Sequence, residues 1–291
     1  MKKLLMWLLL CATFPIASYA NQVQVVTTIK PVSLIVNDLV KGVATNQTLL
    51  PAGASPHDYA LRPSDIRQLD NADLVIWVGP ELEMFLSDLV SRKSHSVQLT
   101  AVDGLKLREF ETHDHHDHDG HHHGTVDPHV WLGPAQAEVA ANAIANALMD
   151  IDPANKQSYQ QNLEDFTMRL QQANNDVKSM LEPVKGKGYF VFHDAYGYFE
   201  DFYGLSQAGH FTVSPDRRPG AKTLNKIRHA LEDKKASCIF TEPQFSPRVV
   251  NSITQGMKIK ISTLDPVASD YKGDYPGFIR NMGKQFAECL Q

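Results

Sequence analysis

The fold is decided by residues 152–182, D-P-A-N-K-Q-S-Y-Q-Q-N-L-E-D-F-T-M-R-L-Q-Q-A-N-N-D-V-K-S-M-L-E. Apolar residues recur there every three or four positions, the period of a helix that packs along one side. These residues are Tyr159, Leu163, Phe166, Leu170, Ala173, Val177 and Met180. Asp152 and Pro153 supply an expected N-cap and first-turn proline, and nothing breaks the pattern before Pro183. At 1.5 Å per residue the helix is roughly 45 Å long, which exceeds one small lobe. We expect it to run along two lobes; a coiled coil is the alternative, but the stripe lasts barely four heptads.

Short apolar runs alternate with helical patterns on both sides of this helix, as in α/β proteins. The expected strands are residues 23–29, 73–79 and 97–99 before it, and 188–192, 211–213, 237–241 and 258–264 after it. Residues 73–79 are nearly all apolar, which is typical of a strand buried on both faces of a parallel sheet. We therefore predict an α/β lobe at residues 21–151, the linking helix at 152–183, and a second α/β lobe at 184–291.

Residues 1–20 have the features of a cleaved secretory signal. Two lysines precede an apolar segment, residues 4–16, and S-Y-A at 18–20 is a small-x-small cleavage site. The apolar segment is too short for a comfortable transmembrane helix. Cys11 follows a leucine, which argues against a lipid-modified cysteine. We expect cleavage after Ala20 and export of the mature chain.

Export and removal of the signal affect the net charge of the mature chain and the state of its cysteines. Loss of the two signal lysines changes the formal net charge from −5 to −7 (−5 − 2), which disfavours nucleic acid as a partner. Loss of Cys11 leaves Cys238 and Cys289. Two cysteines in an exported chain most simply form one disulfide. The alternative is two unpaired buried thiols.

Histidines are concentrated in one segment, since eight of the thirteen lie within residues 113–131. Seven of them form a low-complexity run with three aspartates, and short His-rich tracts commonly bind metal. The seven are His113, His115, His116, His118, His121, His122 and His123. The eighth, His129, stands apart from the run. Metal handling is therefore the first functional hypothesis.

Three solitary histidines are placed alike in the predicted sheets. His57 follows a strand and a turn, His129 stands beside a strand start, and His193 ends a strand. Asp265 also follows a strand directly. Ligands collect at the carboxyl ends of strands in open α/β sheets. Two lobes that meet at a cleft would bring together three imidazoles and a carboxylate, a set that suits tetrahedral zinc. The alternative is that each histidine is a hydrogen-bonded structural residue.

Several long segments resemble the metal-binding components of bacterial cluster A-I ABC importers. The segments in the first half are P-H-D-Y-A-L-R-P-S-D at 56–65, N-A-D-L-V-I-W-V-G-P at 71–80 and D-P-H-V-W-L at 127–132. Those in the second half are G-K-G-Y-F-V-F-H-D-A-Y-G-Y-F-E at 186–200, E-P-Q-F at 242–245 and L-D-P at 264–266. The second set is most similar to the zinc members. The resemblance spans the mature chain in order.

The resemblance implies a fold and a metal site. The fold is two lobes, each a mainly parallel four-stranded sheet flanked by helices, joined by one long backbone helix, with Zn²⁺ held between the lobes. The implied ligands are His57, His129 and His193, and Asp265 falls where manganese-type relatives place a carboxylate. Those relatives commonly have Glu at the His193 position, and nitrogen in place of oxygen moves preference toward zinc. Some zinc members have an acidic residue where this chain has Pro56, so the fourth ligand is Asp265 or water.

The implied function is that of a periplasmic solute-binding protein, not an enzyme. It would capture Zn²⁺ and deliver it to an inner-membrane zinc ABC permease with its cytoplasmic ATPase, and we expect a monomer. The tract 113–123 would be an accessory loop of lower affinity; the alternative is a solvated insertion that binds metal only loosely.

Three other functions compete with this one. A secreted zinc hydrolase would also use three histidines and water, but the sequence lacks H-E-x-x-H and an evident general base beside a ligand. A metal buffer would work through the tract alone. A manganese or iron importer subunit is the third competing function.

Overall fold

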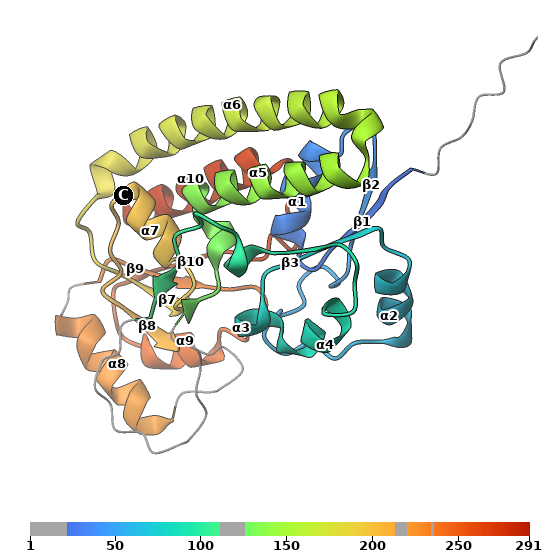
Figure 1. Cartoon of the computed structure of the whole chain (residues 1–291). Helices are drawn as coiled ribbons and strands as arrows, with labels where there is room; N and C mark the ends of the chain where they lie inside the picture. Colours follow the sequence, from blue (N-terminus) through green and yellow to red (C-terminus); the bar gives the residue numbers. More distant parts are fainter. Residues whose placement is uncertain (1–21, 111–125, 213–219, 234–235) are drawn as a thin grey trace, which may run out of the picture.

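Two parallel four-stranded sheets form the frame of the molecule (Figure 1). The computed structural model describes residues 22–110, 126–212, 220–233 and 236–291. The first sheet has the order β2-β1-β3-β4, with β1 Gln24–Thr27, β2 Thr45–Thr48, β3 Leu74–Trp77 and β4 Ser96–Gln98. The second has the order β10-β9-β7-β8, with β7 Tyr189–His193, β8 Gly209–Thr212, β9 Cys238–Thr241 and β10 Lys260–Thr263. The predicted α/β class and its paired sheets are confirmed.

One long helix lies across both sheets (Figure 1). The 3₁₀ turn η4 (Pro153–Asn155) leads into α6 (Lys156–Leu181), and η5 (Glu182–Val184) ends it. The predicted helix is confirmed, but Asp152 is not its N-cap. Asn155 occupies that position without a side-chain hydrogen bond, while Asp152 Oδ2 accepts from the hydroxyl of Tyr159 and the amide of Asn155. Pro153 begins a separate 3₁₀ turn, Pro153–Asn155, so the α-helix starts at Lys156, three residues after the proline.

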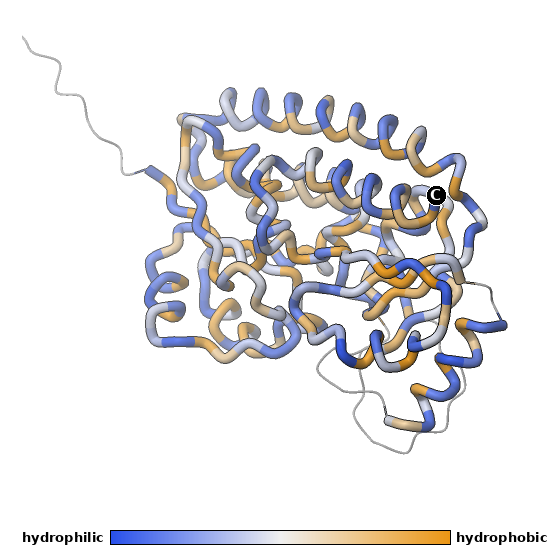
Figure 2. The backbone as a smooth tube through the Cα atoms, turned by 180° about the vertical axis from the view of Figure 1, so that it is seen from behind, coloured by the Kyte–Doolittle hydropathy of each residue, from blue (hydrophilic) through white to orange (hydrophobic). Residues whose placement is uncertain are grey.

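The apolar face of α6 packs on two further helices, α5 (Pro134–Ile151) and α10 (Tyr275–Leu290). Figure 2 shows hydrophilic (blue) and hydrophobic (orange) stretches alternating along the tube of α6. Its buried residues are Tyr159, Phe166, Leu170, Ala173, Val177 and Leu181. A disulfide joins Cys238 in β9 to Cys289 in α10, with the two Cα atoms 5.9 Å apart, so the predicted pairing is present. The C-terminal helix is thereby tied both to α6 and to the second sheet.

The remaining helices lie on both sides of the two sheets, and some of them contact α5 and α6. They are α1 (Lys30–Leu39), α2 (Pro63–Asp70), α3 (Pro80–Glu83), η1 (Met84–Leu86), α4 (Ser87–Val90), η2 (Leu99–Ala101), η3 (Val130–Leu132), α7 (Gly197–Tyr203), α8 (Ala221–Asp233) and α9 (Arg248–Ile253). Among the described residues, none of the helices is long and apolar enough to cross a membrane.

The inner faces of both sheets share one continuous apolar core. Alternate residues of β7 point to opposite faces, as in any strand. Tyr189 and Val191 therefore join the core that also contains β1, β3, α5, α6 and α10, whereas Phe190 and Phe192 join a second core beneath α8 and α9. A shared core of this kind opposes large hinge motions between the sheets, because interiors are close-packed.

Candidate metal site

Three separate segments deliver the three solitary histidines to one place. His57 lies in the loop after β2, His193 is the last residue of β7, and His129 lies between β6 (Val126–Asp127) and η3. His129 and His193 are buried, and His57 is partly exposed. The expected strand start at His129 is replaced by the 3₁₀ turn η3. The cause is local, since the side chain of Asp127 accepts from the backbone N–H of His129 and turns the chain there.

The three imidazoles face one another at a separation that suits zinc. His57 Nε2 and His129 Nε2 are 3.2 Å apart, and one nitrogen from each of the three rings lies within 4.8 Å of the others. Two nitrogens on a tetrahedral Zn²⁺ with bonds of about 2.0–2.1 Å lie about 3.3–3.4 Å apart. Among the described residues, this is the group of His, Cys, Asp and Glu side chains that converges in this way. The predicted convergence of His57, His129 and His193 is therefore present in the fold.

Asp127 fixes the orientation of His129. Its Oδ1 lies 2.7 Å from His129 Nδ1, so Nδ1 carries the proton and Nε2 offers its lone pair to the cavity. A carboxylate behind a ligand histidine sets the tautomer and raises ligand basicity. Burial lowers the pKa of His129 well below its usual value, which keeps the imidazole neutral, and burial raises the pKa of Asp127 to about 7. The D-P-H motif contains this aspartate, but its role behind the histidine was not predicted.

Glu242 stands behind His193 in the same manner. Its Oε1 lies 3.6 Å from His193 Nδ1 and accepts a 3.1 Å hydrogen bond from the hydroxyl of Tyr196. Neither nitrogen of His193 has a hydrogen-bond partner within the described part of the chain, although both are buried. Buried polar atoms are almost always satisfied. A metal ion at Nε2, with Glu242 behind Nδ1, would satisfy this ring, so the residues fit the ion.

Asp265 does not belong to the converging group. Its carboxylate accepts from the backbone N–H groups of Val267 and Ser269 and from the side chain of Gln244, with the last distance 2.7 Å. These bonds hold the turn after β10, and Val267 from that turn lines the metal cavity. The carbonyl of Pro266, in the same turn, accepts from the indole N–H of Trp131. Asp265 thus shapes one wall of the site.

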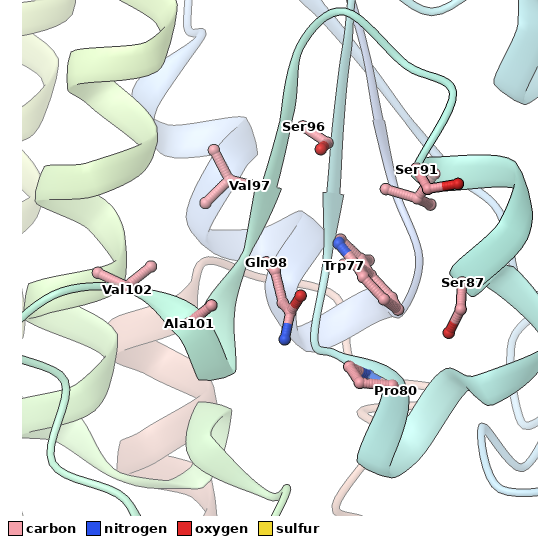
Figure 3. A pocket seen from close by; sticks show the side chains of 10 residues that line it. Trp77, Pro80, Ser87, Ser91, Ser96, Val97, Gln98, Ala101 and Val102 are labelled. Atoms are coloured by element: carbon pink, nitrogen blue, oxygen red, sulfur yellow. The ribbon is translucent and has the colours of Figure 1, made fainter.

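The size of the cavity restricts what it holds. The space beside the three histidines is about 10 Å³, room for one ion or water rather than for an organic substrate. A larger hollow of about 640 Å³ lies beside β3, β4 and α4 (Figure 3). None of its ten lining residues is a His, Cys, Asp or Glu, and Figure 3 shows Trp77, Gln98 and Pro80 among them. The small cavity is therefore the candidate metal site.

Two other predicted features lie outside the described residues. These are the signal at 1–20 and the histidines of the tract at 113–123.

Sequence comparisons identify the family. The model described as zinc-uptake complex component A, periplasmic, matches residues 25–289. The chain belongs to the zinc-uptake complex component A family. The high-affinity zinc uptake system protein ZnuA of Yersinia pestis is 45% identical, with 98% of this chain and 95% of that protein covered. The protein of the same description from Haemophilus ducreyi is 40% identical, with 96% of each chain covered. The resemblance to the zinc members is thus confirmed.

Solved structures share the fold of this zinc-uptake component. A crystal structure of ZnuA aligns with a TM-score of 0.80 at 22% identity, covering 93% of this chain and 100% of that one. The solute-binding protein FpvC from Pseudomonas aeruginosa, in complex with Mn²⁺, aligns with a TM-score of 0.81 at 22% identity, covering 93% and 99%. At these identities the likeness concerns the fold alone: two parallel sheets beneath one long helix.

Proposed function

We propose that this protein captures one Zn²⁺ ion between its two sheets for high-affinity zinc uptake. The observation that carries the proposal is the convergence of His57, His129 and His193 with nitrogen atoms within 4.8 Å of one another. Curated relatives over nearly the whole chain are zinc uptake proteins. The family consists of transport components, so the function is binding and delivery rather than catalysis.

The donor set favours zinc over manganese. Imidazole nitrogen suits zinc, whereas carboxylate and water oxygens suit manganese. Behind the imidazoles, Asp127 and Glu242 offer two carboxylates that offset the charge of a divalent ion. This arrangement holds the cation without placing a carboxylate on the metal.

We propose that water, and not Asp265, completes the tetrahedron. The oxygens of Asp265 already accept from two backbone N–H groups and from Gln244. Moving Asp265 onto the metal would leave those donors unsatisfied, which costs about 1–3 kcal/mol per buried group. An open fourth position also gives an accepting protein a place to begin ligand exchange.

The chain divides, in this proposal, into a signal at 1–20 cleaved after Ala20, lobes at 21–151 and 184–291, and the linking helix at 152–183. The mature protein works as a periplasmic monomer that hands Zn²⁺ to an inner-membrane permease with its ATPase. The shared core beneath α6 limits lobe motion, so loop movement is the expected route of release. The tract 113–123 collects metal at lower affinity, because a sequence of His, Asp and Gly without apolar residues must lose conformational entropy when it binds a metal.

Zinc titration of the mature protein tests the binding proposal. Chelator competition should give one tight site in the parent and loss of most of the affinity in H57A/H129A/H193A. Deletion of residues 113–123 should leave the tight site in place. A tight site that survived the triple substitution but vanished on deletion would establish a metal buffer that works through the tract.

Two further measurements distinguish zinc uptake from manganese uptake and from hydrolysis. Competition between Zn²⁺ and Mn²⁺ at neutral pH should favour Zn²⁺, and preference for Mn²⁺ would reject the zinc assignment. Turnover of esters or CO₂ by the zinc-loaded protein would support a zinc hydrolase; we expect none.

A further inference from the structure

A small antiparallel ribbon joins the metal site to the opposite sheet. The strands β5 (Arg108–Glu109) and β6 pair with Arg108 opposite Asp127. Tyr198 of α7 pins both strands, because its hydroxyl accepts from the backbone N–H of Arg108 at 2.8 Å and donates to the carbonyl of Asp127 at 2.7 Å. The residue that orients His129 is therefore seated on a helix that follows β7.

The side chain of Arg108 runs from the surface of α7 to the buried carboxylate. Its Nε lies 3.3 Å from Asp201 Oδ2, and its Nη1 lies 3.6 Å from Asp127 Oδ2. The side chain of Asp127 is 0% exposed, that of Arg108 22% and that of Asp201 70%. The guanidinium lies against Gly197, where an added Cβ would be 2.4 Å from Arg108 Cζ. Glycine at position 197 therefore leaves the space that the guanidinium of Arg108 occupies.

The two oxygens of Asp127 have different tasks. Oδ1 accepts from the backbone N–H and the ring Nδ1–H of His129. Oδ2 faces Arg108 Nη1, and neither of these two atoms has a hydrogen-bond partner in the described chain. Removing Arg108 would leave a buried carboxylate oxygen with no facing cation, which is strongly unfavourable. The carboxylate would then rotate or draw in water, and His129 would lose its fixed orientation.

We propose that Arg108 is a positioning residue for metal capture: it holds Asp127 in the orientation that aims His129 Nε2 at the ion. Arg108 and Tyr198 hold the β5–β6 ribbon against α7. The orientation of His129, which follows the ribbon, therefore depends on contact with the helix that follows β7 of the second sheet. The inference rests on the proposed binding of Zn²⁺ by the three histidines. A structural role for Arg108, in stability alone, is the competing explanation.

The test uses the full mature protein with Zn²⁺ and Co²⁺ as probes. Zinc affinity by chelator competition, the Co²⁺ ligand-field spectrum, and the apo melting temperature are measured for the parent, R108Q, R108K, D127N and R108Q/D127N. D201N is the matched control, because it removes only the exposed partner of Arg108. The parent must first show one tight site that H129A weakens; if it does not, the proposed function fails rather than this inference.

D127N should weaken zinc binding about 10- to 100-fold, the usual effect of altering the residue that orients a ligand histidine. R108Q, one contact further from the metal, should lose more than about threefold and should change the Co²⁺ spectrum. R108K keeps the charge and should lose less affinity than R108Q. D201N should stay within about threefold of the parent. R108Q should add less than about threefold to D127N, because residues that act through one another are not additive.

A lower apo melting temperature with unchanged zinc affinity and Co²⁺ spectrum in R108Q would overturn the proposal. Additive losses in R108Q/D127N would also overturn it. If R108Q does not fold, G197A carries the test, because it retains the arginine but displaces its guanidinium. G197A should weaken zinc binding at least threefold, and parent-like affinity in G197A would contradict the positioning role.

Discussion

Opening the disulfide between Cys238 and Cys289 should lower the free energy of unfolding by about 4 kcal/mol. The two cysteines are 51 positions apart, and the loop-closure entropy of a link of that span is about 14 cal/mol/K, or about 4 kcal/mol at 25 °C. Both cysteines are buried, and the link ties the last turn of α10 to β9. Without it, α10 is held near the second sheet by packing and by the hydrogen bond that Lys187 Nζ, just before β7, donates to the carbonyl of Leu290.

Urea unfolding of the oxidised parent, the reduced parent and C238A/C289A measures this effect. The reduced parent keeps both sulfur atoms and therefore isolates the covalent link, whereas the alanine variant also loses packing atoms. Zinc affinity should be the same in all three, because neither cysteine lines the metal cavity. Equal unfolding free energies, within about 1 kcal/mol, for the oxidised and reduced parent would refute the reasoning.

Helix packing and two buried titrating groups give three further predictions. G283A places a Cβ 2.6 Å from Val177 Cγ1, between α10 and α6, and should lower the free energy of unfolding in urea by about 1–3 kcal/mol. V177A in the same chain should restore part of that loss. An unchanged free energy of unfolding in G283A would contradict the close fit. Burial raises the pKa of Glu83 from 4.5 to about 7, so its stabilising contribution is complete below about pH 4.5 and is lost as pH rises through about 7. The metal-free parent should therefore lose roughly 3 kcal/mol more than E83Q between pH 4.5 and 8, and parallel stability profiles would exclude this. Burial lowers the pKa of His129, so ¹⁵N NMR of the metal-free protein should show a neutral ring protonated at Nδ1 at pH 6, not an imidazolium.

The strongly patterned elements were predictable from the sequence. The period of residues 152–182 indicates one long helix because no proline interrupts it, and α6 occupies that stretch. The central strand β3 is wholly apolar because both its faces are covered. The strand β2, T-N-Q-T, was not predicted. It lies at a sheet edge and is held by parallel pairing with β1, a contact that polar residues satisfy as well as apolar ones.

Part of the metal site could be predicted from the sequence, because ligands collect at the carboxyl ends of strands in open α/β sheets. His57 and His193 were placed by that rule, whereas the strand expected beside His129 is the 3₁₀ turn η3. The contacts of Asp127 with Arg108 depend on a two-residue ribbon, β5–β6, that has too few residues to show a period. The position of Asp265 at a strand end suggested a metal ligand. In the fold, backbone N–H groups of the turn that follows donate hydrogen bonds to its carboxylate. Such local hydrogen bonding competes with longer-range roles for Asp side chains.

Anomalous diffraction at the zinc edge from crystals of the one-to-one zinc complex tests the central claim most directly. We predict one strong peak between His57, His129 and His193, with three nitrogen ligands at about 2.0–2.1 Å and a water in the fourth position. A principal zinc peak elsewhere in the chain, with the three imidazoles free of metal, would contradict it.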